Sequence, residues 1–262
     1  MTLDLSRFGF GITGKVPADV VRQLAPMVER AGFTTMWFNH IANGNAYASI
    51  EVAARVTSTL RLASGVTSID SMMSASEIVD QVRTRDLPTD RLVIGIGANK
   101  PPSPLRTVKE GVDHLRDELP GVPVYVGALG PKMRALGVTE ADGILLNWLT
   151  PEAARLAQMD RQRDAPDTRA RVALYIRCAL GDASRQSMLT EIARYESFPS
   201  YAANFRRLGF GGRDAAVMVD DGASLRARLE QYQDAVDEPV LRAITAVDSL
   251  EAYVSLLEAL MN

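Results

Sequence analysis

The sequence predicts an α/β fold, a single (β/α)8 barrel (TIM barrel) that forms one domain over residues 1–262. Three observations support this prediction. Eight short apolar segments are each followed by a segment with helical character. One such unit, 122–148, has the pattern of two parallel strands joined by a helix. The chain is also long enough for one large barrel, and 47% of its residues are hydrophobic, so a substantial core is available.

The unit at 122–148 is the clearest part of the pattern. It begins with an apolar run at 122–126, bounded by proline and glycine, as expected for a strand that is covered on both faces. Gly130-Pro131 then marks a turn into a helix at 133–139, because proline is tolerated in a first helical turn. A second apolar run at 144–146 follows. Strand, helix and strand in this order predict one right-handed crossover.

The other elements follow the same alternation along the chain. Apolar runs between turn residues predict strands at 8–12, 34–38, 60–66, 92–96, 122–126, 144–146, 172–179 and 239–246. Two kinds of pattern predict helices: apolar residues on one side of a segment, and capping residues such as Ser74 with Glu77 or Thr150 before Pro151. The predicted helices are 17–31, 47–57, 74–84, 107–119, 133–139, a helix from 150, 184–194, 217–234 and 248–260.

The regular alternation fails after the seventh strand. Residues 197–212 are aromatic, basic and glycine-rich, so an irregular helical insertion is expected at about 184–235, before the last strand. A doubly wound open sheet is the alternative fold. It is disfavoured because no GxGxxG motif follows the first strand; Gly9, Gly11 and Gly14 lie inside that strand or directly after it.

Composition excludes several classes of function. A formal net charge of -3 and a pI near 5.5 argue against nucleic acid as the main partner. There is no apolar run of membrane-spanning length and no signal-peptide pattern, so a cytoplasmic protein without membrane contact is expected. Cys178 is the single cysteine, which excludes a disulfide within the chain and is more typical of packing than of nucleophilic catalysis.

The predicted strand ends indicate the chemistry of the barrel mouth, where barrel enzymes place their active sites. These ends are polar and almost uncharged: Thr13, Asn39-His40, Thr67-Ser68, Gly97-Ala98-Asn99, Gly127-Ala128, Asn147-Trp148 and Arg177-Cys178. They contain no carboxylate pair and no metal-ligand cluster, so no metal site is expected. Amide and hydroxyl groups with glycines suit a large planar cofactor that supplies the difficult chemistry itself.

For each of four side chains at these ends, the sequence allows both a functional and a structural interpretation. His40 is the one residue there that exchanges a proton near neutral pH, although it also suits a structural hydrogen bond. Trp148 suits stacking on a ligand or an aromatic plug. Asn39 and Asn147 suit hydrogen bonds to a ring system or to neighbouring loops.

The turn at 127–132 is a candidate anion site. Gly130 allows close approach of the backbone, the helix start presents free N–H groups, and Lys132 adds positive charge. The alternative is an ordinary strand-to-helix turn that only needs glycine and proline for its shape.

Several segments resemble the bacterial luciferase-like monooxygenase superfamily, and most closely its short deazaflavin-dependent branch. The likeness lies in the segments 128–133 (ALGPKM) and 141–148 (ADGILLNW), together with 32–38, 60–66, 91–97 and 201–210. It implies a luciferase-like barrel with reduced insertions that uses coenzyme F-420 (8-hydroxy-5-deazaflavin, also written F420). The missing proline after the third strand and the short insertion after the seventh are departures from the family pattern.

The resemblance also implies a cofactor site. It assigns the coenzyme phosphate to Gly130, Pro131 and Lys132, and it places a non-proline cis peptide under the ring around Val66-Thr67-Ser68. The full set of expected cofactor-binding residues is Asn39, Val66, Thr67, Ser68, Gly97, Ala98, Asn99, Gly127, Ala128, Leu129, Gly130, Pro131, Lys132, Asn147 and Trp148, with His40 as the catalytic residue.

The function implied is an oxidoreductase that transfers a hydride between the deazaflavin and a small organic substrate held under the 195–210 segment. Arg206 or Arg207 is a possible partner of the coenzyme's acidic tail, although a place on the helix surface suits either residue better. A reduced-FMN-dependent monooxygenase and a non-catalytic flavin-binding barrel are the alternatives. Family likeness further suggests a homodimer formed through the early helices.

Overall fold

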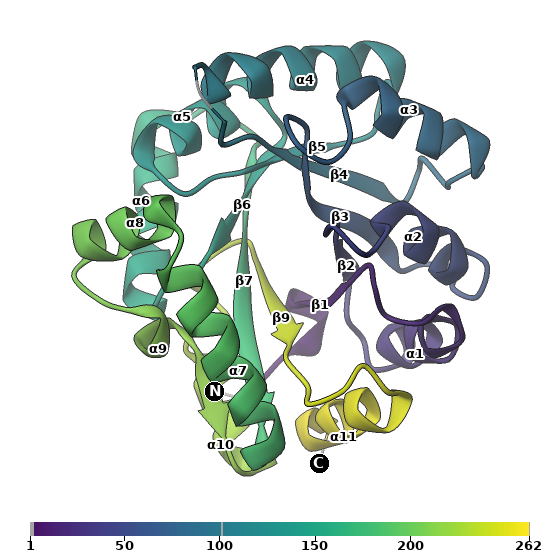
Figure 1. The fold of residues 1–262 in the computed structure, drawn as a ribbon, viewed down its shortest axis with the longest axis vertical. Helices are drawn as coiled ribbons and strands as arrows, with labels where there is room; N and C mark the ends of the chain where they lie inside the picture. Colours follow the sequence, from purple (N-terminus) through teal and green to yellow (C-terminus); the bar gives the residue numbers. More distant parts are fainter. Residues whose placement is uncertain (1–2, 101, 262) are drawn as a thin grey trace.

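A computed structural model describes residues 3–100 and 102–261 and contains the predicted barrel. Figure 1 looks down the barrel axis, with the helices arranged around the strands. The parallel barrel strands are β1 (Gly9–Thr13), β2 (Thr35–Asn39), β3 (Arg61–Ser68), β4 (Leu92–Gly97), β5 (Val124–Gly127), β6 (Gly143–Asn147), β7 (Arg171–Leu180) and β9 (Glu238–Ala243). The barrel closes because β9 pairs with both β1 and β7.

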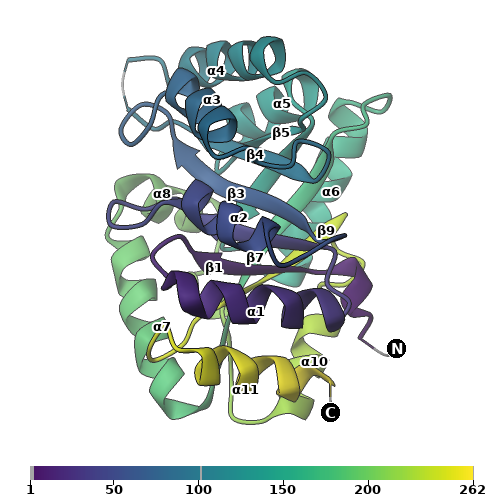
Figure 2. The same cartoon turned by 90° about the vertical axis from the view of Figure 1, so that its right-hand side faces the viewer.

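Most helices cover the outside of the barrel, while α7 (Gly181–Glu196) and α8 (Pro199–Leu208) of the insertion lie at one of its ends (Figure 1, Figure 2). A short 3-10 turn, Leu5–Arg7, precedes β1. The helices are α1 (Ala18–Arg30), α2 (Ala46–Ala54), α3 (Ala75–Thr84), α4 (Pro104–Glu118), α5 (Pro131–Glu140), α6 (Pro151–Asp164), α7 (Gly181–Glu196), α8 (Pro199–Leu208), α9 (Gly212–Ala215), α10 (Gly222–Glu230) and α11 (Leu250–Met261). The expected capping box of Ser74 and Glu77 is present at the start of α3. Among the described residues, no helix has both the length and the apolar character needed to cross a membrane.

The eight barrel strands lie where the sequence predicts them, but two predictions for the insertion are wrong. The segment expected to be irregular, 197–212, contains the regular helix α8, which begins at Pro199, ends at Leu208 and is capped by Gly209 with a positive φ of 79°. The segment expected to be mostly helical from 217 begins instead with a short strand, β8 (Val217–Val219). This strand pairs with the last three residues of β7, starting at Cys178, where the pairing of β7 with β9 ends.

Apolar side chains form three packed regions. The largest lies between the barrel and the surrounding helices. A second fills the barrel interior, and its members alternate along the strands with those of the outer layer, as the period of a strand requires: Trp37, Ala63, Val93, Tyr125, Leu145, Ala173, Tyr175 and Val240. The third lies under α7 and α8. Figure 2 shows these two helices at the end of the barrel toward which β3 points, which is the barrel mouth.

Candidate active site

One side of the mouth, here called the glycine half, is formed by the ends of β3, β4 and β5. The ladder between β3 and β4 shifts register between Ser64 and Thr67. The peptide bond between Gly65 and Val66 is cis, one bond before the segment where the sequence placed it. The Val66 side chain then occupies space that side chains would need on the neighbouring strands, since a Cβ at Gly97 or Gly127 would lie 3.2 or 3.0 Å from its methyl groups.

Hydrogen bonds fix the two chain segments beside this bulge. The buried Thr67 hydroxyl lies 3.1 Å from the phenol oxygen of Tyr47. Asp70 accepts hydrogen bonds of 2.7 Å from the Ser68 hydroxyl and from the backbone amides of Asn99 and Lys100. Burial alone would raise the pKa of Asp70, but these hydrogen bonds lower it. Asp70, which the sequence analysis missed, therefore connects the ends of β3 and β4.

The predicted phosphate turn lies at the start of α5. The Ala128 amide donates to the Leu145 carbonyl, 3.1 Å away, while Pro131 and Lys132 are exposed. Gly130 is the N-terminal cap of α5, with a φ of -92° that any residue adopts, and a Cβ there would meet no heavy atom within 4 Å. Neither backbone conformation nor contacts within the described residues require glycine at this position, and the space above it is open.

Two further cations lie near this turn. Arg134 on α5 has a buried Nε atom without a hydrogen-bond partner among the described residues. Burial, with repulsion from Arg207 of α8 as the next cause, lowers the pKa of Arg134 to about 10. Arg207 itself donates to Asn204 at 2.6 Å. Repulsion from Arg207 outweighs the attraction of Asp160, so positive charge predominates around Arg134.

His40 follows the end of β2 and is half-buried. Its ring centroid lies 6.0 Å from that of Tyr47, and its buried Nδ1 atom has no partner among the residues described. Burial lowers the pKa of His40, so the imidazole is neutral at pH 7. Burial also raises the pKa of Tyr47 to about 12. The structure thus presents a neutral histidine beside a phenol that keeps its proton.

The other side of the mouth, here called the arginine half, is formed by the ends of β6, β7 and β9 with α7. Arg177 on β7 is 2% exposed and donates to Glu191 of α7 at 2.5 Å and to the amide oxygen of Asn147. Its guanidinium lies 4.1 Å from the centroid of the Trp148 ring and 4.5 Å from that of Tyr195. The prediction of an almost uncharged mouth is therefore wrong.

Trp148 and Asn147 both contact Arg177 and belong to the group of side chains around it. Trp148 is 1% exposed and has a positive φ of 56°, and its ring packs between Tyr195, Phe205 and Arg177. The structure therefore shows the aromatic plug and not a ring open to a ligand. Asn147 donates to the Tyr201 hydroxyl at 3.1 Å and accepts from Arg177, so both ends of its amide are used.

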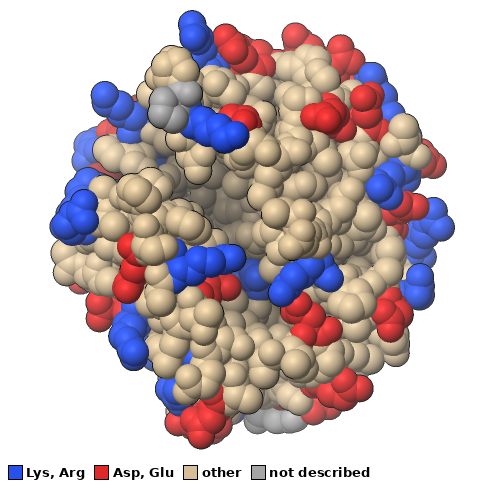
Figure 3. Space-filling model, in the orientation of Figure 1, with Lys and Arg blue, Asp and Glu red and all other residues tan. Residues whose placement is uncertain are grey.

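A cavity of about 450 Å³ opens beside the arginine half. Arg242 on β9 lines this cavity. Its guanidinium donates to the Asn39 side chain at 3.2 Å and to the Ala243 carbonyl. Figure 3 shows the hollow at the centre of this face, with Lys and Arg side chains extending across it. Burial would raise the pKa of Glu191, but attraction to Arg177 and Arg242 holds it below its usual value.

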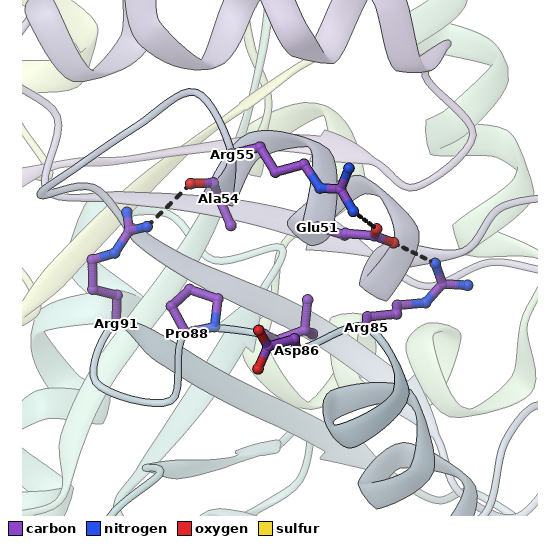
Figure 4. A pocket seen from close by; sticks show the side chains of 8 residues that line it. Glu51, Ala54, Arg55, Arg85, Asp86, Pro88 and Arg91 are labelled. Atoms are coloured by element: carbon purple, nitrogen blue, oxygen red, sulfur yellow. Dashed lines mark hydrogen bonds and ion pairs between the residues drawn. The ribbon is translucent and has the colours of Figure 1, made fainter.

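A second pocket, of about 260 Å³, lies between α2 and the loop after α3, away from the mouth. Figure 4 shows that its glutamate and arginines are bonded, since Glu51 binds Arg55 and Arg85 and Arg91 donates to the Ala54 carbonyl, while Asp86 makes no ion pair with the residues drawn. Cys178 is inert, since it is fully buried and burial raises the pKa of its thiol.

Comparison with known proteins gives a family for this barrel. Residues 104–260 match the sequence model of the luciferase-like monooxygenase family. The chain is 26% identical over 179 residues to 5,10-methylenetetrahydromethanopterin reductase of Methanolobus tindarius, in an alignment that covers 54% of this chain and 55% of the relative. The match thus spans about half the length of the curated relatives.

Solved structures resemble the chain over nearly its whole length. The coenzyme F420-dependent tetrahydromethanopterin reductase from Methanopyrus kandleri superposes with a TM-score of 0.72 at 15% identity, covering 97% of each chain. The monooxygenase RslO1 from Streptomyces bottropensis superposes with a TM-score of 0.69 at 13% identity, covering 97% of this chain and 98% of that one. At such identities the likeness shows the fold alone.

Proposed function

Because the chain belongs to the luciferase-like monooxygenase family, we propose that it is a coenzyme F420-dependent oxidoreductase that transfers a hydride between the deazaflavin and a small organic substrate. The curated relatives are reductases, and two structural neighbours are named for their dependence on F420. A homodimer formed through the early helices is part of the same proposal.

The corner at Gly130 is the observation that carries this proposal. The space above Gly130 is open, and the start of α5 presents backbone N–H groups that favour an anion. Lys132, Arg134 and Arg207 supply positive charge around it. Gly130, Pro131 and Lys132 would hold the coenzyme phosphate, largely through the backbone, with Arg134 and Arg207 as additional cations.

The glycine half suits the ring system. Val66, Gly97 and Gly127 line it without charge, and the Tyr175 hydroxyl beneath Gly65 is buried without a partner among the described residues. An orphan buried hydroxyl is uncommon in a folded protein, so a bound ring that accepts from it explains its place. When bound, the deazaflavin supplies the hydride-accepting or hydride-donating carbon.

His40 moves the accompanying proton in this proposal. Its lowered pKa keeps Nδ1 or Nε2 free to accept a proton at neutral pH, which suits oxidation of an alcohol group. Tyr47, whose hydroxyl is bonded to Thr67, would orient the histidine by filling the space beside it. Asp70 keeps the two loops that flank the ring in place.

A Gly130→Asp variant tests the coenzyme site. Aspartate is a favourable helix cap, so α5 should fold, while its carboxylate repels a phosphate group. We expect F420 affinity, measured by fluorescence titration, to fall by about tenfold or more, as for the loss of a charge-assisted contact. Ala223→Asp adds the same charge to the first turn of α10, away from the mouth, and should leave the affinity unchanged.

The same titration separates the alternatives. Micromolar binding of FMN with no binding of F420 would favour the reduced-FMN-dependent monooxygenase. Tight F420 binding without reduction across a broad panel of alcohols and enones would favour the non-catalytic barrel. Equal affinities of wild type and Gly130→Asp would contradict the assignment of the phosphate to α5.

A further inference from the structure

The cavity of the arginine half has more positive than negative charge. Among the described residues that line it, Lys15, Arg177, Arg194 and Arg242 are cationic and Glu191 and Asp248 are anionic. Both acids are already paired, Glu191 with Arg177 at 2.5 Å and Asp248 with Lys15 at 3.2 Å. Arg194 and Arg242 therefore have no carboxylate partner in the described part of the chain.

Arg242 is the unusual member of this set, because it is buried. Only 6% of its surface is exposed, and its protein partners are neutral oxygens, the Asn39 amide at 3.2 Å and the Ala243 carbonyl. Its Nε and Nη1 atoms make these bonds, whereas Nη2 has no acceptor among the residues described. Glu191 attracts Arg242 from a distance, but its carboxylate is hydrogen-bonded to Arg177, so an anion from outside would complete the contacts of this buried cation.

A second observation at the same place points to a ligand. Thr13 lines the cavity, and its buried hydroxyl has no hydrogen-bond partner among the described residues. The register places Thr13 beside Asn39, which holds Arg242. A hydroxyl donor and a free guanidinium N–H thus lie on neighbouring strand ends, as recognition of an anionic oxygen requires.

The remaining walls indicate what carries the anionic group. Ile41, Ile244 and Val247 line the cavity with apolar surface, and its volume of about 450 Å³ suits a small organic molecule. Asn39 borders the cavity and directly precedes His40, the proposed proton-transfer residue, so the cavity lies at the strand end that carries this histidine.

From these observations we propose that the cavity binds the carboxylate or phosphate group of the substrate, with Arg242 and Thr13 as its anchors and Arg194 as a cation at the rim. This proposal rests on the proposed function for its use in catalysis, because the anchored substrate would present its reacting carbon toward the glycine half. The anchoring itself depends on this chain's own residues. The substrate would accordingly be a small organic acid or phosphate ester with an oxidisable or reducible carbon.

Calorimetric titration of the full chain with inorganic phosphate and with glutarate, at low ionic strength, tests the anchoring without any coenzyme. We expect saturable binding at one site that weakens by about tenfold or more in Arg242→Gln, as for the loss of a charged hydrogen bond. Arg85→Gln removes the same charge from the remote pocket of Figure 4 and should bind like the wild type. Absence of binding, or equal binding by both variants, would overturn the proposal.

Ser187→Asp provides a second variant that does not disturb the buried arginine. Ser187 lines the cavity from α7 and is partly exposed, so an added carboxylate there should fold and repel the probe anions. Weaker phosphate and glutarate binding by this variant supports the proposal even if Arg242→Gln proves unfolded by circular dichroism. Wild-type affinity in a folded Ser187→Asp variant would place the anion elsewhere.

The coenzyme's own acidic tail is the other source of such a group, and a separate titration distinguishes it. If Arg242 serves the substrate, Arg242→Gln should bind F420 and a deazaflavin without the tail as the wild type does. Selective loss of F420 affinity would assign Arg242 to the tail and overturn the substrate proposal. Anion binding without F420 binding would instead leave this site standing while the proposed function fails.

Discussion

The two halves of the barrel mouth are built in different ways. In the glycine half, neighbouring strand ends fit together through small residues, with Val66 occupying the space left by Gly97 and Gly127. In the arginine half, long charged side chains from distant segments meet: Arg177 lies between Trp148 and Tyr195 and binds Glu191. The first half is closely packed and uncharged, whereas the second is suited to charged groups.

The comparison predicts that the arginine half is the more sensitive to loss of a single charge. Glu191→Gln would leave the buried Arg177 without its counter-ion, which should lower the free energy of unfolding by about 3 kcal/mol. Glu51→Gln breaks the more exposed ion pairs with Arg55 and Arg85 and should cost less than about 1 kcal/mol. Urea denaturation of the two variants measures both values.

A double variant sharpens this test. Replacing both Arg177 and Glu191 by methionine removes the buried charges together, so it should recover part of the loss seen in Glu191→Gln. If Glu191→Gln lowers the free energy of unfolding no more than Glu51→Gln does, water must solvate the Arg177 charge in the variant. The two halves would then differ in shape and not in their sensitivity to lost charge.

In the glycine half, the next largest effect should follow from added volume. A Cβ at Gly95 would overlap the carbonyl oxygen of Ser64, a backbone atom that cannot move aside easily. Gly95→Ala should therefore lower the free energy of unfolding by about 2 kcal/mol. At Gly130, where a Cβ meets nothing within 4 Å, the alanine variant should cost less than about 1 kcal/mol.

Thermal or urea unfolding of both glycine variants, followed by F420 titration, separates the two uses of glycine. Gly95→Ala should change stability, while Gly130→Ala should act mainly on coenzyme affinity. The opposite pattern would mean that the fold, and not a ligand, requires glycine at 130.

The same contrast explains what the sequence could predict. The barrel strands and the glycine half follow from short local patterns, because the residues that matter, such as Gly97 and Gly127, stand at the ends of apolar runs. Asp70 and Tyr47 were missed, since their roles depend on which loops the barrel brings together. The cofactor, the proton-transfer role of His40 and the phosphate contacts remain predictions.

The arginine half could not be assembled from sequence, because its contacts join residues far apart in the chain. Glu191 reads as an ordinary helix residue until α7 folds over Arg177. The position of Arg242 in its strand could have been recognised from the sequence, although the sequence analysis did not use it. Arg242 lies on the same face of β9 as Glu238 and Val240, and two charged residues four positions apart on one face of a buried strand indicate polar contacts at that inner face.

His40 lies between the two halves and should give the smallest effect on stability. Its pKa is lowered in the folded state, so between that value and the unfolded value near 6.5 the unfolded chain binds more protons. Stability should therefore fall as the pH decreases through 6.5 and be unaffected by this group at pH 8. His40→Ala should remove that part of the pH dependence, measured by urea unfolding at pH 5, 6, 7 and 8.

The kinetics of His40→Ala distinguish a proton-transfer role of His40 from a role in binding the ring. A proton-transfer residue should lose turnover by about a hundredfold or more with little change in F420 affinity, because it acts on the reacting atoms and not on the phosphate corner. Equal losses in turnover and affinity would make His40 part of the ring-binding surface. In that case the proton would have to come from another group at the mouth, and the buried hydroxyl of Tyr175 is the next to examine.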